Sequence, residues 1–100
     1  MFGYIGKMIA AAGKRDELIA IIGESSREMP GCFNYIIAKD RNDANAIWIT
    51  EIWDSAESHK ASLSLPAVQQ AIAKAKPMIA GFEMTVETEP VLTHRPSQNN

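Results

Sequence analysis

The hydrophobic pattern divides the chain into segments with two different periods. Apolar runs, or apolar residues that alternate with polar ones, predict strands over residues 4–11, 32–39, 46–53 and 82–92. Apolar residues at helical spacing predict a helix over residues 14–29, a short helix from about 55 to 62, and a longer helix that begins near Pro66 and ends near Pro77. Residues 94–100 are mostly polar and are expected to form a loose tail.

The order of these elements predicts the fold class. The polar residues 40–45 lie between two strands, which predicts an antiparallel hairpin in the middle of the chain. Strand, helix, hairpin, helix and strand in this order indicate an α+β domain of the ferredoxin-like βαββαβ type, whose antiparallel sheet has helices on one face only. We therefore expect one domain over residues 1–93, followed by the tail over 94–100.

The strand over residues 46–53 is apolar on both of its faces. Alternate residues share a face, so one face carries Ile47, Ile49, Glu51 and Trp53, and the other carries Trp48, Thr50 and Ile52. Two largely apolar faces indicate a strand that is covered on both sides. The helices cover one face, and a second copy of the chain is the expected cover of the other. A chain of 100 residues buries too little surface to be very stable alone, which also favours a homodimer.

Composition removes several classes of function. The net charge is −2, so the chain lacks the basic face that nucleic acids or anionic membranes would require. The first residues do not resemble a signal peptide, and no apolar run approaches the length of a membrane span, so we expect a cytoplasmic protein. Cys32 is the only cysteine, which excludes an internal disulfide and a zinc site built from thiolates.

Motifs for cofactors and metals are missing from the sequence. The two histidines, His59 and His94, have no partner at a spacing typical of metal ligands. The chain contains no phosphate-binding loop, no dinucleotide fingerprint and no nucleophile elbow. We therefore expect neither a metal nor a cofactor, and we interpret Cys32 as a buried structural residue.

Aromatic residues on the strands provide the candidate chemistry. Six of them fall on predicted strands, where they either pack the core or line an apolar cavity: Tyr4, Phe33, Tyr35, Trp48, Trp53 and Phe82. The indole N–H of Trp53 requires a partner when it is buried, and Glu51 lies on the same face. Glu51 is either paired in a structural salt bridge or with backbone amides, or it is a desolvated carboxyl that accepts a proton.

Four stretches of the chain together resemble the antibiotic biosynthesis monooxygenase family, in its quinol-monooxygenase-like branch. The glycine-lysine start of the first helix corresponds to residues 12–18, and an E-P-G-C-x-x-Y junction corresponds to 28–35. An E-x-W-x-S signature corresponds to residues 48–55, and Ser64-Leu65-Pro66 stands where members often have S-P-H. The resemblance extends over about residues 4–92, nearly the whole chain.

The resemblance implies a dimeric α/β barrel that oxidises a small phenol or hydroquinone with molecular oxygen, without flavin, haem or metal. It implies that Glu51 or His59 accepts the proton of the substrate, and that the substrate contacts Trp53, Tyr35, Ile49 and Tyr4. Two other functions stay open, namely an isomerase or other enzyme that processes a small metabolite in the same pocket, and a dimeric ligand-binding module without catalysis.

Several positions depart from the family's branches. The haem-degrading branch has asparagine, tryptophan and histidine where this chain has about Gly6, Ser62 and Ile72, which argues against haem degradation. Aromatic-polyketide oxygenases have asparagine where this chain has Ile49. Many quinol-type members have histidine at the position of Ser62, and here His59, one helical turn earlier, either serves the same space or is solvated.

Overall fold

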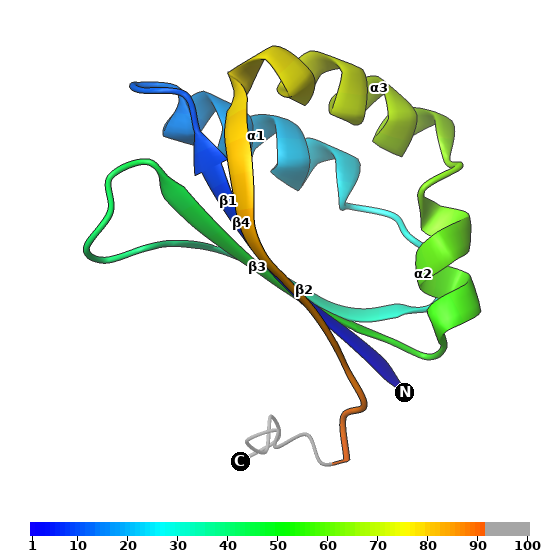
Figure 1. Cartoon of the computed structure of the whole chain (residues 1–100). Helices are drawn as coiled ribbons and strands as arrows, with labels where there is room; N and C mark the ends of the chain where they lie inside the picture. Colours follow the sequence, from blue (N-terminus) through cyan, green and yellow to red (C-terminus); the bar gives the residue numbers. More distant parts are fainter. Residues whose placement is uncertain (92–100) are drawn as a thin grey trace, which may run out of the picture.

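The computed structural model describes residues 1–91, which form a curved four-stranded antiparallel sheet with every helix on one side of it (Figure 1). The elements follow the order β1 (Phe2–Ala10), α1 (Arg15–Ser25), β2 (Cys32–Lys39), β3 (Ala46–Trp53), α2 (Ala56–Ser62), α3 (Pro66–Ala75), a 3₁₀ turn (Lys76–Met78) and β4 (Ile79–Thr88). The strand order β2-β3-β1-β4 confirms the predicted ferredoxin-like α+β fold. The predicted tail and His94 lie outside the described residues.

Helix α1 ends four residues earlier than its hydrophobic pattern predicts. The hydroxyl of Ser25 donates to the carbonyl of Ile22 at 3.0 Å, and the hydroxyl of Ser26 donates to the carbonyl of Gly23 at 3.0 Å. Serine hydroxyls that bond to the backbone compete with the helix, and Pro30 disfavours helical backbone at the residue before it. Arg27 therefore follows the helix instead of lying in its last turn.

Strand β4 begins at Ile79, three residues earlier than predicted, and its register against β1 is interrupted. Lys7 pairs with Met84, whereas the next residue, Met8, pairs with Phe82, so Glu83 is an extra residue in a β-bulge. Paired residues share a face of the sheet. Phe82 therefore lies on the helix side and Met84 on the opposite side, although simple alternation would place them together.

The main core lies between the sheet and helices α1 and α3. Its buried members are Ala10, Leu18, Ile22, Ile47, Ile49 and Ala75. The alternation predicted for β3 is confirmed, because Ile47, Ile49, Glu51 and Trp53 are all buried while the intervening residues are partly exposed. No helix within residues 1–91 is long and apolar enough to cross a membrane.

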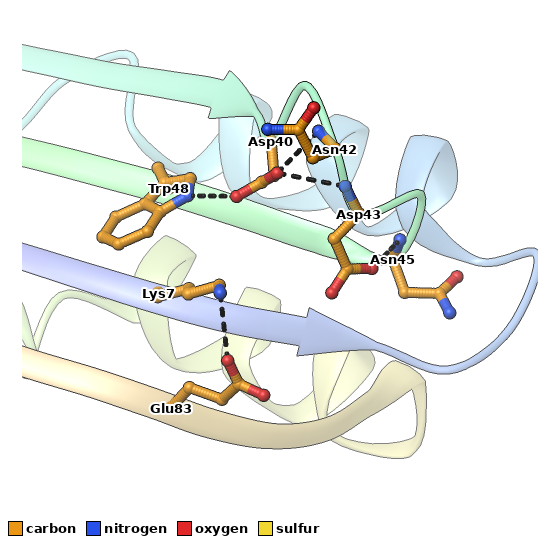
Figure 2. A network of polar contacts seen from close by, with 7 residues as sticks. All are labelled: Lys7, Asp40, Asn42, Asp43, Asn45, Trp48 and Glu83. Atoms are coloured by element: carbon orange, nitrogen blue, oxygen red, sulfur yellow. Dashed lines mark hydrogen bonds and ion pairs between the residues drawn. The ribbon is translucent and has the colours of Figure 1, made fainter.

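The opposite side of the sheet, here called the open face, is covered by nothing within residues 1–91. Its exposed large apolar side chains are Ile36, Met84 and Val86. Each of them pairs with a residue on the same face of the sheet as Trp48, which places all three on the open face. A polar network occupies one end of this face (Figure 2): the Trp48 indole donates to Asp40 at 2.8 Å, and Lys7 pairs with Glu83 at 3.0 Å. The open face is thus apolar along most of its length and charged at one end.

Candidate active site

A cavity of about 220 Å³ lies between the helix side of the sheet and helix α2. All four strands contribute to its walls, which include Tyr4, Gly6, Tyr35, Ile49, Glu51, Phe82 and Thr85, and α2 contributes His59. An apolar cavity of roughly 150 Å³ holds one benzene molecule, so this space is sufficient for a single aromatic ring. A carboxyl, an imidazole and phenol groups therefore surround a space the size of a small aromatic compound.

Glu51 is the acidic group of this cavity and is only 7% exposed. Its Oε1 atom accepts a hydrogen bond from the indole N–H of Trp53 at 2.9 Å, and Nε2 of His59 lies 3.8 Å from the same oxygen. Burial raises the pKa of Glu51 above its ordinary value, while the bond from Trp53 and the proximity of His59 oppose that shift. Glu51 is thus a buried carboxyl whose proton affinity is increased, as a general base requires.

His59 is held among aromatic rings rather than in solvent. Its ring stacks on Tyr4 with the centroids 4.9 Å apart, and the edge of Trp53 meets it at 5.5 Å. Phe2 lies at 5.2 Å in a tilted arrangement, and only 17% of the His59 side chain is exposed. His59 is therefore a largely buried residue of the cavity wall rather than a solvated one.

Helix α2 is positioned by the junction between Pro30 and β2. Gly31 has a φ of +84°, and a Cβ atom at this residue would lie 2.7 Å from Ser58 and 2.8 Å from Asp54. Only glycine therefore fits both the backbone conformation and the close approach. The amide of Asp54 donates to the carbonyl of Gly31 at 2.9 Å, and Ser55 caps α2 by accepting from the amide of Ser58 at 3.1 Å. This junction holds His59 over the cavity.

Tyr35 and Cys32 lie on β2, next to the buried carboxyl. Burial raises the pKa of Tyr35, and the charge of Glu51 raises it further. Cys32, which the sequence predicted to be buried, is only partly buried, and this partial burial raises the pKa of its thiol. Both groups are therefore neutral near pH 7, so Tyr35 is a hydrogen-bond donor in the cavity rather than a base, and the thiol lacks the thiolate character of a nucleophile.

The structure brings five of the six predicted site residues into the cavity wall: Tyr4, Tyr35, Ile49, Glu51 and His59. Trp53 is different. It is completely buried and does not line this cavity, but it contacts two residues of the wall, through its bond to Glu51 and through the edge of its ring against His59. Ser62 is also buried and donates its hydroxyl to the carbonyl of His59 at 2.6 Å.

Other wall residues were not among these six predicted site residues, although Phe82 was one of the aromatic residues expected either to pack the core or to line a cavity. Gly6 lies in the wall, where an added Cβ would meet the Tyr4 ring at 3.6 Å, and Lys7, Met8, Leu63 and Thr85 also line the cavity. Phe82 reaches the cavity because of the bulge in β4, which the alternation of apolar residues did not reveal. Within residues 1–91, no group of three His, Cys, Asp or Glu side chains is arranged to hold a metal ion.

Comparisons with known proteins agree with one another. The family model described as Antibiotic biosynthesis monooxygenase matches residues 1–74. A crystal structure of a "putative Antibiotic biosynthesis monooxygenase" from Chloroflexus aurantiacus is 57% identical, with a TM-score of 0.92, over 94% of this chain and 96% of that one. A protein from Deinococcus radiodurans with the same description is 25% identical, with a TM-score of 0.77, over 97% and 99% of the two chains.

A third structure, from Caulobacter crescentus, is 17% identical with a TM-score of 0.83 over 91% of this chain and 90% of that one, and its likeness shows the fold. No curated protein matches the chain significantly.

Proposed function

The chain belongs to the antibiotic biosynthesis monooxygenase family, and on that premise we propose that it is a cofactor-independent monooxygenase of a small phenol or hydroquinone. The observation that carries the proposal is the Glu51–His59 pair in a cavity that has room for one aromatic ring. A phenol is a weak acid with a pKa near 10, so its reaction with oxygen requires a base that removes the hydroxyl proton.

The proposed reaction uses the substrate itself as the reductant. Glu51 accepts the hydroxyl proton, which leaves the negative charge on the phenolate, and His59, whose Nε2 atom lies 3.8 Å from the same carboxylate oxygen, lies beside this proton transfer. The phenolate transfers electrons to O₂; one oxygen atom forms a new bond to the ring and the other leaves as water. For a hydroquinone, the balanced products are one hydroxyquinone and one water, and the ring supplies all the electrons that oxygen takes up.

The remaining wall residues orient and desolvate the ring. Tyr35, which stays neutral, donates a hydrogen bond to a substrate oxygen, and Ile49 and Tyr4 pack against the ring. Trp53 acts behind this wall as a positioning residue, since its N–H fixes the orientation of the Glu51 carboxylate. Holding the reacting ring against a fixed base is a large part of what a protein without a cofactor contributes.

Oxygen consumption tests the proposal. Metal-stripped protein should accelerate O₂ uptake by a hydroquinone well above the rate of autoxidation, and ¹⁸O₂ should label one oxygen atom of the quinone product. Glu51→Gln should abolish the acceleration. If wild-type protein and Glu51→Gln both give only the autoxidation rate, the chain is not an oxygenase of these compounds.

A second candidate function is supported by the same pair of groups. A carboxylate and an imidazole beside the same cavity, here with Nε2 of His59 3.8 Å from Oε1 of Glu51, are sufficient to isomerise a small metabolite by proton transfer without oxygen. Turnover of a metabolite under strict anaerobiosis would favour this function. Ligand binding without turnover, either in air or under anaerobic conditions, would indicate a binding module instead.

We also propose that a second copy of the chain covers the open face. Ile36, Met84 and Val86 are each at least 40% exposed there, and contiguous exposed apolar surface of this kind marks an interaction site. Sedimentation analysis should show a dimer for wild type and a monomer for Ile36→Glu, whereas Ala73→Glu, on the exposed side of α3, should remain a dimer. A monomeric wild-type protein would contradict the proposal.

A further inference from the structure

A second, apolar cavity adjoins the active-site cavity beneath helix α3. It has a volume of about 320 Å³ and shares Met8, Tyr35, Ile49, Leu63 and Phe82 with the first cavity. Its other walls come mainly from the inner side of α3, where Val68, Ala71, Ile72 and Ala75 lie at helical spacing. We call the first space the polar lobe and this one the apolar lobe.

The two lobes differ sharply in chemistry. The polar lobe contains Glu51 and His59, whereas the walls of the apolar lobe are almost entirely aliphatic or aromatic. Ser25 is the polar side chain at the far end of the apolar lobe, and its hydroxyl already donates to the carbonyl of Ile22 at 3.0 Å. Tyr35 lies in the wall that the two lobes share, and the remaining walls of the apolar lobe present no charged group, so hydrocarbon would be favourable there.

Large apolar side chains at the rim of the apolar lobe are unusually exposed. Phe82 is 66% exposed, Ile72 51% and Leu63 47%, although Ile72 belongs to a stripe that its spacing predicts to be buried. Phe82 lies on the helix side of the sheet, so a second copy on the open face would not reach it there. The exposed ring of Phe82 is therefore available to a ligand that extends out of the polar lobe.

We propose that the apolar lobe binds an aliphatic chain on the substrate, so that the substrate is an alkyl- or prenyl-substituted phenol or hydroquinone. The aromatic ring of the substrate occupies the polar lobe with its hydroxyl toward Glu51, and its aliphatic chain runs between Leu63 and Phe82 beneath α3. If roughly 150 Å³ holds the six carbons of benzene, the apolar lobe of about 320 Å³ has room for about a dozen carbons. This inference rests on the proposed function for the position of the ring.

Binding of 4-alkylphenols under anaerobic conditions tests the proposal without requiring turnover. Each methylene that becomes buried strengthens binding by up to about fourfold. At only half of that free energy, about twofold per methylene, the five methylenes between 4-methylphenol and 4-hexylphenol should decrease the Kd measured by calorimetry about thirtyfold. An unchanged Kd along this series would overturn the proposal, and the lobe would then be a space filled by protein.

A matched pair of variants tests whether the alkyl chain of the ligand binds in the apolar lobe. Ala71→Phe fills the apolar lobe, whereas Ala73→Phe adds the same ring on the exposed side of the same helix. Ala71→Phe should reduce the gain from methyl to hexyl to about threefold and leave the Kd of 4-methylphenol within about twofold of wild type. Ala73→Phe should retain the full gain. Equal gains in both variants would overturn the assignment.

A second pair of variants tests the same assignment if Ala71→Phe does not fold. Ile72→Glu places a charge at the half-exposed rim and should weaken binding of 4-hexylphenol at least tenfold more than binding of 4-methylphenol, and Ala73→Glu should not. The two proposals fail separately. Oxygen uptake without chain-length dependence would contradict the apolar lobe alone, and chain-length-dependent binding without oxygen uptake would contradict the monooxygenase alone.

Discussion

The two faces of β3 carry the same interaction in two different environments. On the helix side, Trp53 donates to Glu51 at 2.9 Å, and on the open face, Trp48 donates to Asp40 at 2.8 Å (Figure 2). The pKa of Glu51 is nevertheless raised and that of Asp40 lowered. Burial is the dominant cause for Glu51. For Asp40, the bond from Trp48 comes first, followed by the amide of Asn42 at 2.8 Å.

The difference shows that the hydrogen bond alone does not determine the proton affinity of a carboxylate. An indole N–H stabilises the charged form in both pairs, but desolvation exceeds this effect only where the carboxylate is buried. The Trp48–Asp40 pair, which is only partly buried, orders the loop between β2 and β3, where Arg15 also donates to the carbonyl of Asp43 at 2.9 Å. The buried pair instead supplies a base with increased proton affinity beside a cavity.

The largest expected difference between the two pairs is in catalysis. Glu51→Gln keeps the volume and the acceptor for Trp53 but cannot take a proton, and loss of a general base lowers kcat by roughly 10²- to 10⁴-fold. Asp40→Asn, the same change in the Asp40–Trp48 pair, should leave kcat within about twofold of wild type. Oxygen uptake at saturating hydroquinone measures both, and similar rates for the two variants would remove Glu51 from the chemistry.

This contrast also separates what the sequence predicts from what it does not. The period of β3 predicted correctly that Glu51 and Trp53 share a buried face, and five predicted residues meet in one cavity. Alternation describes which face a side chain occupies but not which atoms meet. Trp53 was therefore expected to contact substrate, although the structure places it behind the wall as the partner of Glu51.

Local irregularities account for the other differences. A β-bulge at Glu83 moves Phe82 to the helix side, and a bulge is set by pairing between strands that are far apart in sequence. The exposure of Ile72 likewise results from the space beneath α3, although helical spacing alone assigns this residue to the core. Cavities arise from the way whole elements pack, so no local pattern indicates them.

The next largest effect is expected from changing the support of α2, which covers the Glu51–Trp53 pair and not the Asp40–Trp48 pair. Gly31→Ala forces a side chain into a positive φ, which costs about 1–3 kcal/mol, and adds an overlap with Ser58. We expect a loss of about 2–4 kcal/mol in urea unfolding, together with reduced kcat as His59 shifts. Gly13→Ala, at φ +77° with no atom within 4 Å of the added Cβ, should cost about 1–2 kcal/mol and spare kcat.

A smaller effect is expected from removing each indole donor. Trp53→Phe removes the bond that favours ionised Glu51, so the pKa of this carboxyl should rise further. In a plot of kcat against pH, the decrease at low pH that reports protonation of Glu51 should move to higher pH. In that range the kcat of Trp53→Phe should be about tenfold lower than that of wild type, and at alkaline pH the two should differ less. Trp48→Phe should leave this decrease in place. A decrease that moves equally in both variants would show that it does not report on Glu51.

The smallest effect is a difference in stability that has opposite signs for the two carboxylates. Because the pKa of Glu51 is raised on folding, the stability it contributes is present below pH 4.5, its ordinary pKa, and is lost as the pH rises through the folded-state pKa. Glu51→Gln should therefore raise Tm at pH 7 and change it little near pH 4.

Asp40 should show the reverse. Its pKa is lowered on folding, so its stabilisation is present above its ordinary value of 3.8 and is lost as the pH falls through the folded-state pKa. Asp40→Asn should lower Tm at pH 7, and the deficit should disappear toward pH 2. Calorimetric scans of both variants against pH measure the two trends. Parallel trends would mean that burial does not distinguish the two pairs, because the hydrogen bonds from Trp53 and Trp48 are nearly equal in length.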